Sequence, residues 1–167
     1  QIGEAAFEGT KIIFPTRVVE TTRSIDLGGR TLTMVARPTA HTDNDLTIFD
    51  QTTGTLFLGD LLFSEHVPTL DGSILGWLKL ISVLRNETAQ RVVPGHGPAV
   101  MSWPDALSPL EDYWSLIARE VRSAIAAGKT LSEATESVGQ SERRKWEMFD
   151  EHHVRNVTAA FAELEWE

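Results

Sequence analysis

Strand-like runs make up much of the first sixty residues, and residues 31–34 alternate polar and apolar side chains as a half-buried β-strand does. Two pairs of such runs, at residues 24–27 with 30–37 and at residues 46–50 with 55–58, are each separated by a turn. The first turn is Gly28-Gly29, which tolerates the positive φ angles of a tight hairpin. We therefore predict two β-hairpins, preceded by a strand over residues 11–20 that Pro15 interrupts.

Helical spacing of apolar residues replaces this alternation later in the chain. Residues 74–84 predict a helix, and residues 91–93 predict a short buried strand. Three more helices are predicted: from an N-cap at Ser102 to Gly128, from a Thr130/Glu133 capping box to Gly139, and after a cap at Ser141. The last carries an apolar face of Val154, Val157, Phe161 and Leu164. Strands and hairpins first, with helices later, define an α+β fold class.

Composition narrows the function classes. The 167 residues are the size of one domain, and 41% of them are hydrophobic. The net charge of −9 disfavours binding to a phosphate backbone, so no nucleic-acid partner is expected. No apolar run approaches the length of a membrane span, so no membrane partner is expected either. Cysteine is absent, which rules out disulfides and thiolate metal sites.

Three short motifs carry the candidate chemistry. Ala-His-Thr-Asp at residues 40–43, Gly-Asp-Leu-Leu at 59–62 and Pro-Gly-His-Gly-Pro at 94–98 each follow a predicted strand. Each places one metal-capable side chain at a strand end: His41, Asp60 and His96. Two imidazoles and one carboxylate form an N/O donor set that suits zinc.

These motifs resemble the second half of a metallo-β-lactamase superfamily domain. Residues 40–45, 54–76 and 92–98, including the segment 66–73, look most similar to the quinoprotein relay system zinc metallohydrolases. The resemblance implies the C-terminal half of an αβ/βα sandwich. It also implies a zinc-dependent hydrolase that acts on a small-molecule substrate with an ester, thioester or amide-like bond. For the parent protein it implies a periplasmic location.

The resemblance also implies roles for the three side chains. His41 would bind the first of two zinc ions and His96 the second, and Asp60 would bridge them as the catalytic carboxylate. His66 would line the substrate cleft or donate a proton, although a surface loop histidine is the default interpretation. Asp43 and Asp45 would orient His41 from behind, although solvated loop carboxylates are the simpler interpretation.

One family feature is missing from the sequence. No His-x-His-x-Asp-His cluster occurs among the 167 residues. We therefore interpret residues 1–167 as a single partial domain without the N-terminal half, in which the zinc site is partial or empty and the isolated chain is inactive. A homo-oligomer or association with the missing half is expected. A degenerate paralogue, and a metal-free scaffold or interaction module without catalysis, remain the alternatives.

The remaining histidines and the tryptophans receive simpler interpretations. His152 and His153 are adjacent, so on a helix they face different directions and do not form a ligand pair. The five tryptophans are predicted to lie in the core or in an interface with the missing half: Trp77, Trp103, Trp114, Trp146 and Trp166.

Overall fold

Strands in the computed structural model, which describes residues 7–167, form one six-stranded mixed sheet. In chain order they are β1 (Thr22–Asp26), β2 (Thr31–Ala36), β3 (Leu46–Asp50), β4 (Thr55–Phe63), β5 (Arg91–His96) and β6 (Met101–Ser102). Their order in the sheet is the same as their order in the chain. Every neighbouring pair is antiparallel except β4 and β5, which are parallel.

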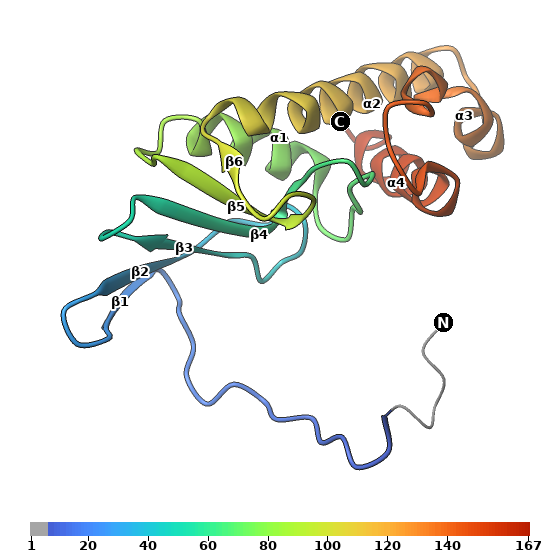
Figure 1. Ribbon diagram of the computed structural model, residues 1–167. Helices are drawn as coiled ribbons and strands as arrows, with labels where there is room; N and C mark the ends of the chain where they lie inside the picture. The colour runs from blue at the N-terminus through green and yellow to red at the C-terminus, as the bar shows by residue number, and fades with distance from the viewer. Residues whose placement is uncertain (1–6) are drawn as a thin grey trace.

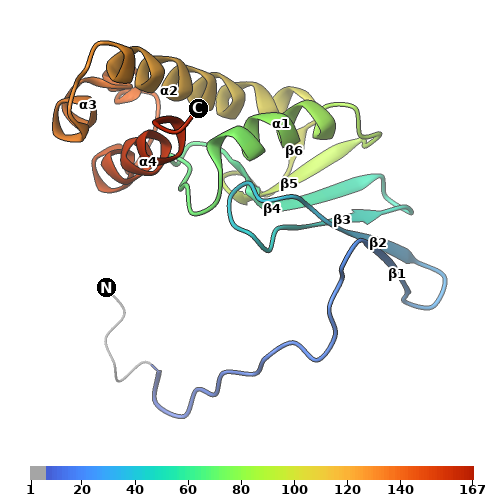
Figure 2. The ribbon, with the colours of Figure 1, turned by 180° about the vertical axis from the view of Figure 1, so that it is seen from behind.

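One helix lies between β4 and β5, and the other helices follow the strands. They are α1 (Ile74–Leu84), α2 (Ser108–Ala126), α3 (Leu131–Ser137) and α4 (Phe149–Leu164), with short 3-10 turns at Asp105–Leu107 and Gln140–Glu142. Figures 1 and 2 show α1 and α2 over one face of the sheet, with α3 and α4 beyond its end. No helix within residues 7–167 is long and apolar enough to cross a membrane.

Both predicted hairpins are confirmed, but the predicted N-terminal strand is wrong. Residues 11–20 pair with no neighbouring strand in the described chain, and they run as an extended stretch away from the sheet (Figure 1). Ile12 and Ile13 are 83% and 88% exposed. Apolar alternation specifies a strand only where a partner satisfies the backbone hydrogen bonds and covers the apolar side chains.

Helix positions were predicted better than helix starts. Helix α1 has the predicted bounds, and the capping box of Thr130 and Glu133 begins α3. Ser102, however, lies in β6 and α2 begins at Ser108. Ser141 lies in a 3-10 turn, and α4 begins at Phe149.

The core lies between the sheet and the helices. Trp77 of α1 and Trp114 of α2 are fully buried, and their ring centroids lie 4.9 Å apart. Trp166, in contrast, is 83% exposed, so of its two predicted places, core or interface, the core is excluded. The buried face of α4 also differs from the prediction, because Val154 is 53% exposed while His153 and Asn156 are buried.

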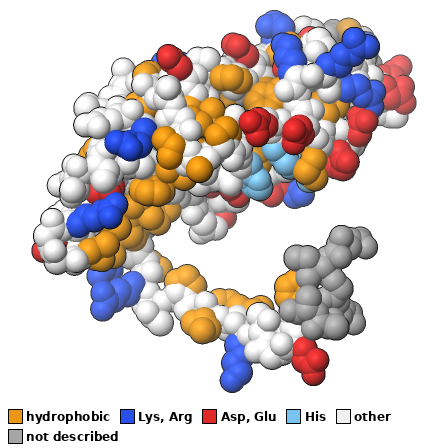
Figure 3. Space-filling model, in the orientation of Figure 1, with side chains coloured by type: hydrophobic (Ala, Val, Ile, Leu, Met, Phe, Trp, Pro, Cys, Tyr) orange, Lys and Arg blue, Asp and Glu red, His pale blue; other side chains and the backbone are white. Residues whose placement is uncertain are grey.

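The opposite face of the sheet carries a row of apolar side chains. Leu56 and Leu58 of β4 belong to the core, so strand alternation turns Phe57 to the other face. Phe57 pairs with Ile48 of β3 and Val93 of β5 in register, so these three side chains share that face. Phe57 is 37% exposed, and Figure 3 shows a band of hydrophobic side chains over the region of the sheet. We call Ile48, Phe57 and Val93 the open-face row.

An ion pair at the end of β3 makes folding stability depend on pH. The Asp50 side chain is buried and accepts hydrogen bonds from Arg30 Nε at 3.0 Å and Thr53 Oγ1 at 2.6 Å. These two bonds, the one from Arg30 foremost, lower the pKa of Asp50 to about 2. The stabilisation is therefore complete above the unfolded pKa of about 4 and is lost as pH falls towards 2.

Replacing this carboxylate should remove that dependence. We expect Asp50→Asn to lower the free energy of unfolding at pH 7, because Arg30 loses its anionic partner. The variant should also lose less stability than wild type between pH 4 and pH 2. Urea unfolding across this range measures both effects, with Glu136→Gln on the exposed face of α3 as the control. Parallel pH profiles for wild type and Asp50→Asn would contradict the assignment.

Candidate metal centre

Parallel pairing brings the carboxyl ends of β4 and β5 to the same edge of the sheet. His96 is the last residue of β5 and pairs in register with Phe63, the last residue of β4. Asp60 was predicted just past its strand, but β4 continues to Phe63. The strand remains irregular there, because the register shifts at Gly59, whose φ is +53°. Asp60 thus lies within β4, with its side chain close to Gly95 near the end of β5.

His41, Asp60 and His96 lie together. His41 belongs to the loop between β2 and β3, and its Nε2 is 3.5 Å from Asp60 Oδ2. His96 Nε2 is 3.6 Å from Asp60 Oδ1. The two imidazoles therefore face different oxygens of one carboxylate. Both separations are longer than a normal hydrogen bond.

The His41 ring is fixed by its other nitrogen. Its Nδ1 lies 2.8 Å from the carbonyl oxygen of Thr69. Because a carbonyl can only accept, Nδ1 carries a hydrogen, and Nε2 is the ring nitrogen that faces Asp60. The ring also packs edge-on against Trp77, with centroids 5.5 Å apart. Sequence reasoning missed Thr69, since a backbone carbonyl leaves no signal in the residue type.

His96 and Asp60 are more open than His41. Their side chains are 45% and 46% exposed, against 10% for His41. The His96 ring stacks on Phe63 at 4.5 Å between centroids, with an angle of 10° between the planes. Gly95 gives Asp60 its room, because a Cβ atom at this position would lie 2.0 Å from Asp60 Oδ1.

His66 lies beside the three predicted ligands. Its ring is 5.1 Å from the His96 ring, and its Nδ1 lies 2.6 Å from the carbonyl oxygen of Val67. His152 of α4 lies next to His66, with its ring centroid 5.2 Å from that of His66. We call His96, His66 and His152 the histidine row. Figure 3 shows histidine side chains in one group with acidic side chains next to them. The neighbourhood of His152 was not foreseen, because α4 is far away in sequence.

The two loop carboxylates differ in what they contact. Asp45 accepts hydrogen bonds from the Thr42 backbone at 3.1 Å and from the Thr42 hydroxyl at 2.9 Å, which fixes the loop after His41. Asp43 accepts a hydrogen bond from Asn44 at the surface. Within the described residues, neither carboxylate hydrogen-bonds the His41 ring. Thr69 orients that ring instead.

Donor geometry limits what this site can hold by itself. In residues 7–167, no group of three or more His, Cys, Asp or Glu side chains surrounds one point closely enough to hold an ion. Asp60 instead divides its oxygens between two histidines. A pocket of about 380 Å³ opens beside His41 and Asp60, with Asn44 and Leu58 in its wall.

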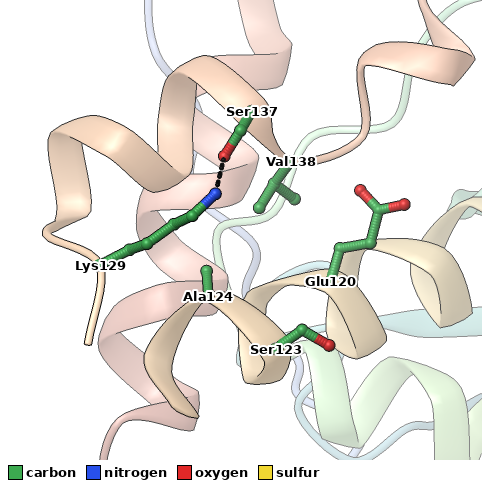
Figure 4. A pocket seen from close by; sticks show the side chains of 6 residues that line it. All are labelled: Glu120, Ser123, Ala124, Lys129, Ser137 and Val138. Carbon is green, nitrogen blue, oxygen red and sulfur yellow. Dashed lines mark hydrogen bonds between the residues drawn. The ribbon is translucent and has the colours of Figure 1, made fainter. Parts of the chain in front are cut away.

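A second hollow contributes nothing to this centre. It measures about 210 Å³ and lies between α2 and α3, where Lys129 Nζ donates to Ser137 Oγ at 3.2 Å (Figure 4). None of the predicted site residues lines it.

Solved structures share this fold. A metallo-β-lactamase from Pontibacter korlensis is 24% identical, with a TM-score of 0.55 over 66% of this chain and 53% of its own. A metallo-β-lactamase family protein from Thermus thermophilus is 15% identical, with a TM-score of 0.66 over 89% of this chain and 47% of its own. A double mutant of a sec-alkyl sulfatase is 14% identical, with a TM-score of 0.64 over 86% of this chain and 25% of its own.

The chain thus has a metallo-β-lactamase-like fold. It spans about half the length of the first two of these structures and 25% of the length of the third. No protein-family model matches the sequence, and no curated protein matches it. At these identities the likeness shows the fold, and the chemistry must be argued from the site.

The close approach of Gly95 to Asp60 gives a direct test of the site geometry. We expect Gly95→Ala to displace the Asp60 carboxylate, because the new methyl group would overlap Oδ1, at a cost of about 1–3 kcal/mol of stability. Side-chain carboxyl NMR shifts of Asp60 and ring shifts of His96 should both change. Val100→Ala, at a half-exposed position after the same loop, is the control. Unchanged Asp60 and His96 signals in Gly95→Ala would show that Gly95 and Asp60 do not approach each other this closely in solution.

Proposed function

We propose that this chain supplies the second half of a two-zinc site in a hydrolase of the metallo-β-lactamase superfamily. One observation carries the proposal: the two oxygens of Asp60 face the Nε2 atoms of two different histidines, at 3.5 and 3.6 Å. Two ligands that each lie about 2.0–2.2 Å from a zinc ion are about 3.3–3.6 Å apart at tetrahedral angles. The separations therefore suit a cation between each pair.

Each donor also fits zinc chemically. The Nδ1 hydrogen of His41 is held by Thr69, which leaves Nε2 as the ligating atom. Asp60 would offset the charge of two neighbouring cations. Such ions, when bound, lower the pKa of a coordinated water towards neutrality and so generate a nucleophile.

The donor set remains incomplete for catalysis. Catalytic zinc usually has three protein ligands, whereas each ion here would receive one histidine and a share of Asp60. We place the other ligands in a His-x-His-x-Asp-His segment of the same polypeptide or of another. The finer resemblance of residues 66–73 supports the quinoprotein relay type of enzyme.

The proposed reaction is hydrolysis of a small molecule at an ester, thioester or amide-like bond. The likeness in fold to a sec-alkyl sulfatase supports hydrolysis but does not select the bond. His66 lies next to His96 with Nδ1 occupied by Val67, so its Nε2 is free to meet a substrate. We propose that it contacts substrate and does not bind metal.

A metal-free scaffold is the competing function. The lack of a three-ligand group in residues 7–167 favours it. Zinc uptake separates the two functions, because a scaffold has no reason to hold Asp60 between the Nε2 atoms of two histidines.

Ligand variants test the proposed function. The chain alone should bind fewer than two zinc ions after dialysis and should not hydrolyse ester, thioester or β-lactam substrates above background, because each ion lacks a third protein ligand. His41→Ala, Asp60→Ala and His96→Ala should each reduce the zinc content further. His152→Ala, in the same histidine row but outside the three ligands, should leave it unchanged.

Activity is tested after a first-half domain with the His-x-His-x-Asp-His cluster has been added, fused or in trans. In that protein Asp60→Ala should lose more activity than His66→Ala, by at least about 100-fold if a charged catalytic element is removed. Steady-state kinetics and metal content are measured on the same preparations. Full rate and full metal content in Asp60→Ala would refute the proposal.

The same proposal predicts association. The open-face row leaves apolar side chains on the face of the sheet that a second layer covers in a sandwich. We propose that either the first half of the domain or a second copy of this chain packs there. Light scattering of the isolated chain should give a mass above the 18.5 kDa monomer.

A charge in the open-face row should abolish this association. We expect Phe57→Glu to reduce the mass to that of the monomer. Val83→Glu, at a half-exposed position on α1 in the opposite layer, should not do so. A wild-type monomer, or equal effects of the two variants, would contradict the assignment.

A further inference from the structure

We infer that Asn156 of α4 is a positioning residue for the metal centre, acting on His41 through the loop of residues 67–70. The inference rests on the proposed zinc site, since it concerns how one of its ligands is held. Within the described residues, Asn156 hydrogen-bonds to Leu70, Pro68 and Tyr113 and to none of the three proposed ligands. It is fully buried and lies 86 residues from Leu70 along the chain.

The carboxamide of Asn156 hydrogen-bonds to the backbone of the residues before and after Thr69. Its Oδ1 accepts from the Leu70 backbone N–H at 2.9 Å, and its Nδ2 donates to the Pro68 carbonyl at 2.6 Å. The Leu70 N–H belongs to the same peptide group as the Thr69 carbonyl, which accepts the Nδ1 hydrogen of His41, and the Pro68 carbonyl belongs to the preceding peptide group. The side chain therefore fixes the direction in which the Thr69 carbonyl points.

A second set of bonds fixes Asn156 itself. Its Nδ2 also donates to the Tyr113 hydroxyl at 3.0 Å, and that hydroxyl lies 3.0 Å from His153 Nδ1. His153 Nε2 donates to the Val138 carbonyl at 2.8 Å, so Nδ1 accepts from Tyr113. Burial lowers the pKa of His153 and keeps the ring neutral. Every polar atom of this buried chain has a partner, which is the condition for such a network to specify one geometry.

The consequence for His41 concerns its tautomer. In water, a neutral imidazole exchanges between the Nδ1–H and Nε2–H tautomers. A fixed carbonyl at Nδ1 selects the Nδ1–H tautomer. Only that form offers the Nε2 lone pair towards Asp60. Loosening the loop would let the hydrogen move to Nε2 and would block the ligating atom. Partners that orient a ligating histidine typically contribute about 10- to 100-fold in metal affinity.

Two variants of the same network separate positioning from mere stability. Asn156→Leu keeps the size of the side chain and removes both bonds to the loop. Tyr113→Phe breaks the network on its other side and leaves the bonds to Pro68 and Leu70 in place. Both variants should lower Tm. Asn156→Ser, which is smaller and admits water, replaces Asn156→Leu if that variant does not fold.

The first readout uses the metal-free chain. Ring ¹⁵N shifts of His41, at a pH where imidazoles are neutral, should show the Nδ1–H tautomer in wild type and in Tyr113→Phe, and a mixture in the Asn156 variants. The Leu70 amide should exchange with solvent as slowly as the amides of α4 in wild type. The second readout is zinc affinity, which should fall about 10-fold in the Asn156 variants and remain near wild type in Tyr113→Phe.

The two proposals fail in different ways. If wild type binds no zinc but the tautomer still depends on Asn156, the metal function is wrong and the positioning role stands. An unchanged His41 tautomer in both Asn156 variants, an equal change in Tyr113→Phe, or a fast-exchanging Leu70 amide would overturn the positioning role.

Discussion

Parallel pairing of β4 with β5 is the constraint on which the rest of the site depends. Parallel neighbours cannot be joined by a tight turn, so the chain must cross over between them, and α1 forms part of that crossover. The pairing brings Asp60 and His96 to one edge of the sheet. The crossover also contains the loop of residues 67–70, which supplies the carbonyl that orients His41. One topological requirement thus delivers two side chains and the support for a third.

Hydrophobic periodicity predicted strands and helices correctly where the apolar positions are buried in the folded chain. Helix α1 and both hairpins were found from sequence because their apolar positions face a core that exists. Residues 11–20 have the composition of a strand but lack a pairing partner within the described chain, and no local signal reveals that. The starts of α2 and α4 were missed because serine is a common capping residue but does not cap a helix at these two positions. Ser102 lies in a β-strand and Ser141 in a 3-10 turn.

In the candidate site, too, some features could be predicted from the sequence and others could not. Its three side chains were identified from short motifs and lie together, although their metal role stays a prediction. What holds them could not be read from the sequence. Thr69 acts through its backbone, Phe63 supports His96 by ring stacking, and Asn156 reaches the loop from another helix. Backbone groups and contacts between distant segments leave no pattern at fixed spacing, so only the folded chain shows them.

Helix α4 holds the crossover at more than one point. Near its end, Glu163 accepts hydrogen bonds from the Ser73 hydroxyl at 2.6 Å and from the Ile74 backbone N–H at 2.8 Å, at the start of α1. A carboxylate at a helix N-terminus satisfies free N–H groups and suits the helix dipole. In the middle of α4, Asn156 holds the loop that precedes α1. The position of the loop along α4 is therefore fixed. Buried hydrogen bonds specify such a position better than apolar packing does, because they are directional.

Two features of the chain agree with the proposal that a further layer completes this domain. Asp60 shares its oxygens between two histidines, and neither pair alone completes a zinc coordination sphere. The open-face row likewise has apolar side chains on a sheet face that the helices do not cover. One added layer with a sheet and further imidazoles would complete both. The solved structures with this fold are about twice the length of the matched part or longer, so they have room for such a layer. A scaffold module would need the cover but not the ligands, so the placement of Asp60 between the Nε2 atoms of two histidines is the feature that argues for a metal.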